Sequence, residues 1–402
     1  MSKSLCARSV LPHLRVLRAI GFCRLGARSG ASAARRAVQH AYHVLAFILL
    51  CIFVGQQLLY AYQVTRSDMD KLARVMFLML CHTTCLAKQF VFHMYADQID
   101  EMILALEDPL FGQRAGRGAA LLRGTARRAA RLLRGYAGCA LATCVLWLVF
   151  PVVSRVRAYP HEFPFWTVLI IYIPLNLNAH RFVAVLLYSF YATSVVAVGN
   201  TTMDAFIVTL LDQSKTQLII LRMNFGSLIE RADAIQLQTG RNHLIVLKEL
   251  FIELPKLLCG TLQRVFGAPL LVQFGVGGWI LCMTAYRIVS LNVLSIEFAS
   301  TTLFMTCILT ELFLFCYYGN EVTVESDRVA ESVYGMEWTR APPAFRRSLA
   351  LVMECARRPL RPAAGHVIPL SLDTYLKVIE TFLDVIIRLA THIKIFFYIF
   401  RS

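Results

Sequence analysis

Charged residues are scarce in this chain, and that scarcity is the first guide to its class. Only 16% of the 402 residues are charged and 57% are hydrophobic, whereas an ordinary soluble domain is about 25% charged and about 45–50% apolar. The mean hydropathy of +0.58 agrees with this. The composition excludes an intrinsically disordered chain, a disulfide-rich secreted module and a fibrous protein, and it favours a membrane protein.

Catalytic and metal-binding motifs are also missing. The chain contains no HExxH, GxSxG or GxxxxGK[ST] pattern, so nothing in it points to an enzyme. Its twelve cysteines are scattered and include no CxxC pair. We interpret them as small buried thiols in a lipid-embedded core, because a metal site needs more converging ligands. We expect no cofactor and no bound metal.

Long apolar runs, in contrast, are abundant. A bilayer core about 30 Å thick requires about 20 mainly apolar residues in a helix. Lipid-facing backbone has to satisfy its own hydrogen bonds, so each run is interpreted as a helix. The predicted fold is an all-α polytopic membrane protein with seven transmembrane helices, over 41–63, 72–95, 135–154, 182–211, 265–286, 298–318 and 369–387.

Basic residues fall on alternate sides of these spans. The N-terminal segment and the segments after the second, fourth and sixth spans together hold 29 Lys and Arg residues, against nine in the other four segments. The basic side is cytoplasmic by the positive-inside rule, so we predict a cytoplasmic N-terminus and an extracellular C-terminus. Because topology accounts for the formal charge of +16, we expect membrane lipid and no nucleic acid as a partner.

This orientation does not fit a G-protein-coupled receptor, which has its N-terminus outside. The chain also lacks an Asn-Pro dipeptide for an NPxxY motif, and the predicted outer loops contain no cysteine. The first forty residues carry eight basic and no acidic side chains. A mitochondrial transit peptide can have this composition, but a cytoplasmic tail that obeys the positive-inside rule explains it more simply.

The seventh span is amphipathic. Its charged residues are spaced by three or four positions and share one helical face, opposite a face that includes Leu376 and Leu383. Charge at membrane depth normally faces a bundle interior or a water-filled cavity. Two alternatives are ion pairs buried against neighbouring helices and an inner half of the helix that lies in the cytoplasm. We predict an aqueous pathway lined by Asp373, Lys377, Glu380, Asp384 and Arg388.

The predicted outer halves of four other spans are rich in aromatic residues and methionine. Such side chains, with a few hydroxyl groups, suit a small apolar ligand. A lipid-facing surface with an interfacial aromatic belt is the alternative. The candidate ligand-binding residues are Met76, Phe77, Met79, Trp147, Phe150, Tyr188, Tyr191, Phe298, Thr301, Phe304 and Met305.

A set of residues with characteristic spacing follows the sixth span: Gly319-Asn320-Glu321, Glu325-Ser326, Tyr334, Trp338, Arg358-Pro359, Ala364-Gly365, Pro369, Ser371-Leu372 and Thr374-Tyr375. This spacing resembles the C-terminal signature of insect odorant receptors. Weaker similarity to that family occurs at 14–22, 217–223 and 269–274, so the resemblance extends over most of the chain. Members of the family have seven membrane helices and a cytoplasmic N-terminus, which agrees with the charge distribution.

The resemblance implies a ligand-gated, non-selective cation channel subunit that detects volatile small molecules in the plasma membrane of olfactory sensory neurons. It implies a heterotetramer with the shared odorant co-receptor, and this chain lacks the co-receptor's long insertion after the fourth span. The whole of 1–402 would form one seven-helix domain. Its parts are a cytoplasmic segment (1–40), helices one to six (41–318), a cytoplasmic anchor between subunits (319–368), and the pore helix with the C-terminus (369–402).

The chain departs from the family pattern after residue 381. The segment 382–402 is longer than the usual aromatic-rich end, and Arg388 falls near the family's apolar gate residue. Because an arginine is unfavourable in a cation pore, either partner subunits supply the working gate or this end comes from an alternative exon or a wrong gene model. A gustatory-receptor channel is the main alternative function, although the motifs at 319–338 fit the odorant branch better. A transporter would need internal repeats or broken helices, and neither is evident.

Overall fold

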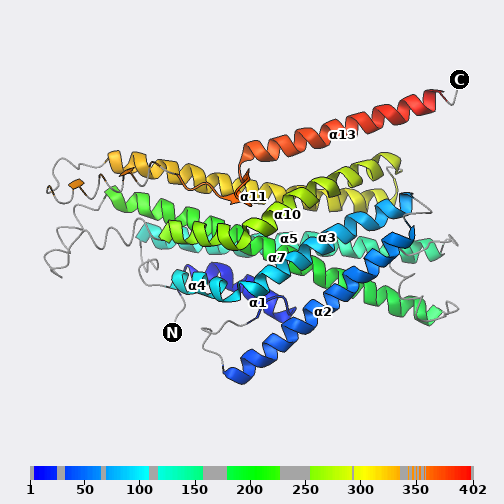
Figure 1. The fold of residues 1–402 in the computed structure, drawn as a ribbon, viewed down its shortest axis with the longest axis horizontal. Helices are drawn as coiled ribbons and strands as arrows, with labels where there is room; N and C mark the ends of the chain where they lie inside the picture. The colour runs from blue at the N-terminus through cyan, green and yellow to red at the C-terminus, as the bar shows by residue number, and fades with distance from the viewer. Residues whose placement is uncertain are drawn as a thin grey trace.

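The computed structural model describes residues 4–24, 32–64, 69–107, 116–156, 179–226, 254–291, 294–335 and 359–399, with isolated residues between 343 and 357. Within these ranges the chain is almost entirely helical, with one short two-stranded ribbon (Figure 1). The elements are α1 (Ala7–Ala19), α2 (Ala33–Val64), α3 (Met69–Met94), α4 (Ala96–Glu107), α5 (Gly116–Val156), α7 (Ala179–Gly226), α10 (Leu254–Ser290), α11 (Ile296–Tyr334), β1 (Ala363–Ala364), β2 (Ile368–Pro369) and α13 (Leu372–Ile399).

The seven predicted spans each coincide with one helix, in the order α2, α3, α5, α7, α10, α11 and α13. In the described part of the chain, α2, α5, α7, α10 and α11 contain stretches that are long and apolar enough to cross a membrane. The prediction of an all-α polytopic membrane protein is therefore confirmed. Helices α3 and α13, which carry charged residues along their length, fall outside that group of five.

Several helices are much longer than a bilayer requires. Helix α7 has 48 residues and, at about 1.5 Å per residue, is about 72 Å long, more than twice the thickness of the hydrocarbon core. Helices α7 and α11 extend past the other helices at one end of the molecule (Figure 1). The residues that follow the predicted fourth span, 212–226, are thus part of the same uninterrupted helix.

Helix α7 is the centre of the bundle. In its apolar stretch, 78% of the residues are buried, a larger share than in the other four helices of the group. It packs against α1, α3, α5, α10 and α11. Three rings form the core between α3, α7 and α10: Phe92 lies 5.7 Å from Phe206 and 5.4 Å from Phe266. A helix that is buried to this extent needs hydrogen-bond partners for most of its polar groups.

The N-terminal helix α1 packs into the bundle against α4, α5 and α7. Gly21 ends it in the left-handed conformation (φ 78°), where Phe22 N donates to Leu17 O at 2.7 Å, as in a Schellman cap. His13 is buried on this helix, and burial lowers its pKa to about 4, so the ring is neutral near pH 7. Segment 14–22 therefore holds α1 against the rest of the bundle.

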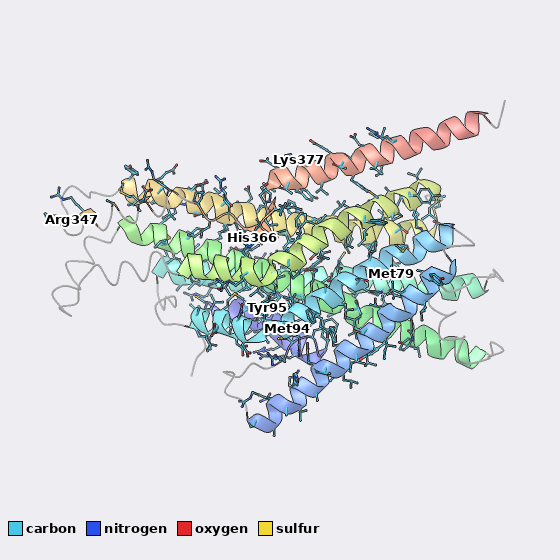
Figure 2. All side chains as sticks on the ribbon, in the orientation of Figure 1. Met79, Met94, Tyr95, Arg347, His366 and Lys377 are labelled. Atoms are coloured by element: carbon cyan, nitrogen blue, oxygen red, sulfur yellow. The ribbon has the colours of Figure 1, made fainter. Side chains whose placement is uncertain are left out.

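Among the described residues of the C-terminal signature, several meet at one junction. Strands β1 and β2 pair antiparallel between α11 and α13. Gly365, with φ 58°, donates its N–H to the Gly267 carbonyl of α10 at 2.8 Å. The next residue, His366 (Figure 2), forms a hydrogen bond of 2.8 Å with the side chain of Gln263 on α10. On the other side, Gly319 of α11 packs directly against Leu370. The junction therefore fastens α10 and α11 to the start of α13.

Helix α13 lies along the edge of the bundle (Figure 1) and packs against α10 and α11. Ser371 caps its start by accepting the Thr374 N–H at 3.2 Å. The helix is turned slightly from the predicted orientation, because Leu376 and Leu383 are exposed while the packed side carries Tyr375 and Phe382. The five predicted pathway residues, Asp373, Lys377, Glu380, Asp384 and Arg388, are all exposed on this helix.

The contact between Gly319 and Leu370 yields the first prediction. A methyl group on Gly319 would lie 2.7 Å from the Leu370 carbonyl oxygen, so we expect Gly319→Ala to destabilise the protein by about 1–3 kcal/mol. The measurement is the thermal transition of detergent-purified protein. The matched control is Gly260→Ala, because a Cβ at Gly260 meets no atom within 4 Å. An unchanged transition for Gly319→Ala would contradict the packing of this junction.

Candidate functional site

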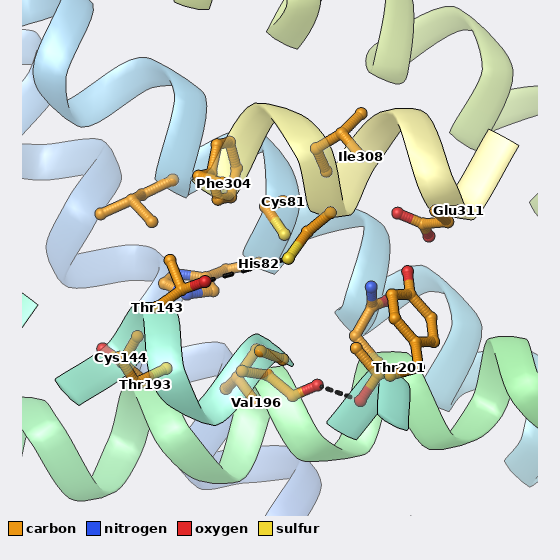
Figure 3. A pocket seen from close by; sticks show the side chains of 16 residues that line it. Cys81, His82, Thr143, Cys144, Thr193, Val196, Thr201, Phe304, Ile308 and Glu311 are labelled. Atoms are coloured by element: carbon orange, nitrogen blue, oxygen red, sulfur yellow. Dashed lines mark hydrogen bonds between the residues drawn. The ribbon is translucent and has the colours of Figure 1, made fainter. Parts of the chain in front are cut away.

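A cavity of about 70 Å³ lies among α3, α5, α7 and α11 (Figure 3). These are the second, third, fourth and sixth of the predicted spans, the same four between which the sequence favoured a ligand. Its walls are mainly apolar, and polar groups enter from the helices at a few points. The apolar lining includes Leu78, Ala140, Val196, Phe304 and Ile308, and the polar lining includes His82, Thr143, Asn200, Thr201 and Glu311.

The two ends of the cavity differ in polarity. Phe304, Thr143 and Cys144 lie at one end, whereas Glu311 and Thr201 lie at the other (Figure 3). Phe304 and Glu311 are seven residues apart on α11, which corresponds to about 10 Å along the helix axis. The cavity is therefore an apolar slot with a carboxylate at one end, a common arrangement for a site that binds and orients a small organic molecule.

The carboxylate at that end belongs to a buried ionic network. The Lys88 Nζ of α3 donates to Asp204 Oδ1 of α7 at 2.5 Å, to Asn200 Oδ1 at 3.0 Å and to Glu311 Oε1 of α11 at 3.1 Å. The side chains of Lys88, Asp204 and Glu311 are only 2%, 2% and 6% exposed. The network thus connects three helices through one ammonium group inside the bundle.

Sulfur atoms form another part of the wall. Cys81, Cys144 and Cys307 line the cavity, and the Sγ atoms of Cys139 and Cys307 lie 3.4 Å apart between α5 and α11. Thr143 Oγ1 is 3.8 Å from the same Cys307 sulfur. Cys144 is buried, whereas Cys81, Cys139 and Cys307 are partly buried and Cys282 on α10 is exposed. The contact places the thiols of Cys139 and Cys307 within reach of one another.

His82 links the cavity to α2. Its ring forms a buried hydrogen bond with the Gln57 side chain through Nδ1, at 2.8–3.0 Å. The Phe53 ring of α2 lies 5.2 Å from the His82 ring. Although α2 does not line the cavity, it fixes the position of a side chain that does.

The eleven predicted ligand-binding residues are distributed unevenly around this cavity. Phe304 lines it, and Met79 and Thr301 are buried nearby on lining helices. Met76, Phe298 and Met305 are partly buried. Tyr188 and Tyr191 are 42% and 70% exposed, and the Tyr188 ring lies 6.3 Å from the ring of the buried Phe53. The side chains of Phe77, Trp147 and Phe150 lie outside the described residues.

The cavity lies one to two helical turns deeper than the sequence-based prediction placed the site. On α5, for example, the lining begins at Tyr136 and ends at Cys144, whereas the predicted residues on this helix were Trp147 and Phe150. Sequence reasoning missed Glu311 and Asn200 altogether. A signal for them existed, because Lys88 and Glu311 are opposite charges within predicted spans, and such residues usually pair.

Helix α11 connects the cavity with the C-terminal junction. Eight residues after Glu311 it reaches Gly319, and two residues later Glu321 accepts from Lys215 of α7 at 2.5 Å. Further along, Glu325 accepts from Arg222 of α7 at 2.5 Å, and Ser326 Oγ accepts the Leu360 N–H at 2.9 Å. A displacement of α11 at the cavity therefore has a continuous mechanical route to the start of α13.

Comparison with known proteins gives a consistent result. The family model described as 7tm Odorant receptor matches residues 68–382. The chain is 29% identical over 122 residues to odorant receptor 94a of Drosophila melanogaster, covering 30% of this chain and 32% of that protein. It is 27% identical over 168 residues to odorant receptor 22b of the same species, covering 40% and 42%.

A longer alignment and a solved structure extend this similarity. Odorant receptor 46a, isoform B, of Drosophila melanogaster is 24% identical over 344 residues, 78% of this chain and 81% of that protein, although the first two alignments span less than half of their relatives. The insect olfactory receptor OR5 from Machilis hrabei, in complex with eugenol, has a TM-score of 0.79 at 12% identity, with 95% of this chain and 97% of that chain covered. At that identity the match establishes the fold alone.

The ionic network gives a prediction about stability. Lys88→Met would leave two buried carboxylates without their cation, and breaking a buried pair in this way costs about 3–5 kcal/mol. We expect the variant to lose most of its folded, detergent-extractable protein in size-exclusion chromatography. Lys215→Met is the matched control, because its pair with Glu321 is partly exposed and is worth at most about 1 kcal/mol. Equal yields of the two variants would show that the network does not hold the bundle.

The two neighbouring thiols give a prediction about proximity. Copper-phenanthroline oxidation should join Cys139 to Cys307, each thiol losing one hydrogen atom to the oxidant, because their sulfur atoms are already in contact. The measurement is the number of thiols that remain for alkylation, counted by intact mass. We expect a loss of two thiols that reductant reverses. Cys139→Ser should prevent the loss and Cys144→Ser should retain it; a loss that survives in Cys139→Ser would disprove this pairing.

Proposed function

The chain belongs to the 7tm odorant receptor family, and we propose that it acts as the odorant-tuned subunit of a ligand-gated, non-selective cation channel. In this proposal it assembles with the odorant co-receptor as a heterotetramer in the plasma membrane of olfactory sensory neurons. Its N-terminus is cytoplasmic and its C-terminus extracellular, as the positive-inside rule favours. The division into a segment 1–40, a bundle 41–318, an anchor 319–368 and a pore end 369–402 is part of the same proposal.

The observation that carries the proposal is the apolar cavity among α3, α5, α7 and α11. A volatile molecule is small and largely apolar, and a buried slot lined by Phe304, Ile308, Val196 and Leu78 removes such a molecule from water. The structurally similar receptor of Machilis hrabei is solved with eugenol, a small aromatic molecule. We infer that this chain holds its odorant in the cavity, with Phe304 in contact with it.

The other predicted ligand-binding residues take less direct roles in this proposal. Met79, Thr301, Met76, Phe298 and Met305 lie on the lining helices without lining the cavity, so they would shape the entrance or support the wall. The exposed Tyr188 and Tyr191 would face lipid or the interface, where aromatic residues are favoured.

The exposed face of α13 supports the pore part of the proposal. Charged side chains at membrane depth are costly in lipid and normally line water. We therefore assign the pathway to the face of α13 that carries Asp373, Lys377, Glu380, Asp384 and Arg388, which is exposed in the single chain. Arg388 opposes cations electrostatically, so the co-receptor subunits would supply the gate residues.

Ligand binding would reach the pore through α11. A ligand opens the channel only to the extent that it binds the open state more tightly than the closed state. A shift of α11 at Phe304 would move Gly319, and the contact of Gly319 with Leu370 would carry that movement to α13. The odorant thus biases the position of the pore helix without touching it.

Filling the cavity tests this function. Ala140→Phe should abolish odorant-evoked cation current in cells that also express the co-receptor, because Ala140 lines the cavity and the larger ring would occupy it. Leu141→Phe is the matched control, since Leu141 is the adjacent residue and is 39% exposed. We expect at least about a tenfold loss of response for the first variant and little change for the second, with equal surface labelling.

The same recordings decide the broader proposal. Current that depends on a volatile, on this chain and on the co-receptor together would support a tuning subunit. The absence of current with both subunits at the cell surface would overturn the channel assignment. A full response of the Ala140→Phe variant would show that the odorant binds outside this cavity.

A further inference from the structure

The polar end of the cavity carries information about the chemical class of the ligand. Two carboxylates, Asp204 and Glu311, contact the same ammonium group of Lys88. When both carboxylates are ionised, the cluster has one excess negative charge. An excess charge buried this deeply is costly unless a proton or another cation neutralises it.

Only one of these carboxylates can meet a ligand directly. Glu311 lines the cavity together with Asn200 and Thr201, whereas Asp204 and Lys88 are not part of its wall. Glu311 projects from α11 at the end of the cavity away from Phe304 (Figure 3). The excess charge of the cluster is therefore presented to the cavity through a single carboxylate.

Resting on the proposed function, we propose that the preferred ligand is a small amine with an apolar tail, whose ammonium head binds Glu311 and whose tail lies against Phe304. In the empty site the two carboxylates share one proton. The amine enters as the neutral, membrane-permeable base and takes that proton, so that an N–H bond forms as a carboxyl O–H bond breaks. The ammonium then neutralises the cluster in place of the proton, and no charge enters or leaves the bundle.

The geometry favours an amine over an alcohol or a hydrocarbon of the same shape. An alcohol can donate one hydrogen bond to Glu311, but it cannot take up the shared proton, so no ion pair forms between ligand and carboxylate. A hydrocarbon covers the carboxylate and desolvates it without offering a partner, which is unfavourable. Hydrogen bonds between ionised groups are roughly twice as strong as neutral ones, so the order of potency should be amine, alcohol, hydrocarbon.

The test compares three probes that share one apolar tail: isoamylamine, isoamyl alcohol and isohexane. The co-expressed channel should respond to isoamylamine at a concentration at least about tenfold lower than to isoamyl alcohol, and least to isohexane. A thermal-shift measurement on the purified chain gives the same comparison without any current. Equal potency of the amine and the alcohol would overturn the inference.

Two variants distinguish the effect of the cluster's excess charge from the effect of direct contact between Glu311 and the ligand. Glu311→Gln removes the carboxylate that meets the ligand, and Asp204→Asn removes the one that does not; both abolish the excess charge, so both should reduce the amine preference to within about twofold. Leu141→Phe, a change on the exposed side of α5, should retain it. If Glu311→Gln fails to fold, Asp204→Asn still decides the point, and a full amine preference in either variant would overturn the inference.

The outcomes also separate this inference from the proposed function. Odorant-evoked current from other volatiles with no preference for the amine would overturn the assignment of ligand class alone. Silence toward every volatile, with both subunits at the surface, would overturn the channel function and the ligand class with it.

Discussion

The buried ammonium group of Lys88 is the constraint around which the bundle is organised. A lysine at this depth is tolerated only if its charge is met, and Asp204, Asn200 and Glu311 meet it from α7 and α11. That requirement fixes the rotation of three helices relative to one another. The network also sets the position of the cavity, because Asn200 and Glu311, which bind Lys88, form the polar end of its wall.

The cavity and the C-terminal junction are two ends of one mechanical element. Helix α11 carries Phe304 and Glu311 in the cavity wall, Gly319 against Leu370, and Glu325 in an ion pair with Arg222. Because a helix resists bending and its interior contacts are closely packed, a change at the first site cannot be absorbed locally. The residues of the family signature therefore have physical roles: two glycines permit close approach, and the acidic residues fasten α11 to α7.

The sequence was sufficient for the class of fold and for the location of the helices, because apolar length and backbone hydrogen bonding are local properties. It was less informative about how each helix is turned. On α13 the charged face was identified, but Leu376 and Leu383 are exposed because the aromatic rings of Tyr375 and Phe382 occupy the packed side. The candidate ligand-binding residues lie on the four helices that line the cavity, but nearer the ends of those helices. The depth of the cavity depends on where Lys88 finds its partners, which lie 112 to 223 residues away along the chain.

The contact between Gly319 and Leu370 restricts which positions can change in sequence: the cavity wall can vary, whereas this junction cannot. The walls of the cavity are ordinary apolar side chains, and exchanging Ile308 or Val196 for another of similar volume would alter which molecule fits without disturbing a helix. Position 319 has no such freedom, because any side chain there collides with the backbone of Leu370. A gene duplicate could thus change the shape of the cavity in a few substitutions while keeping the junction between α11 and α13 unaltered, a modularity that suits a family with many variants of one fold.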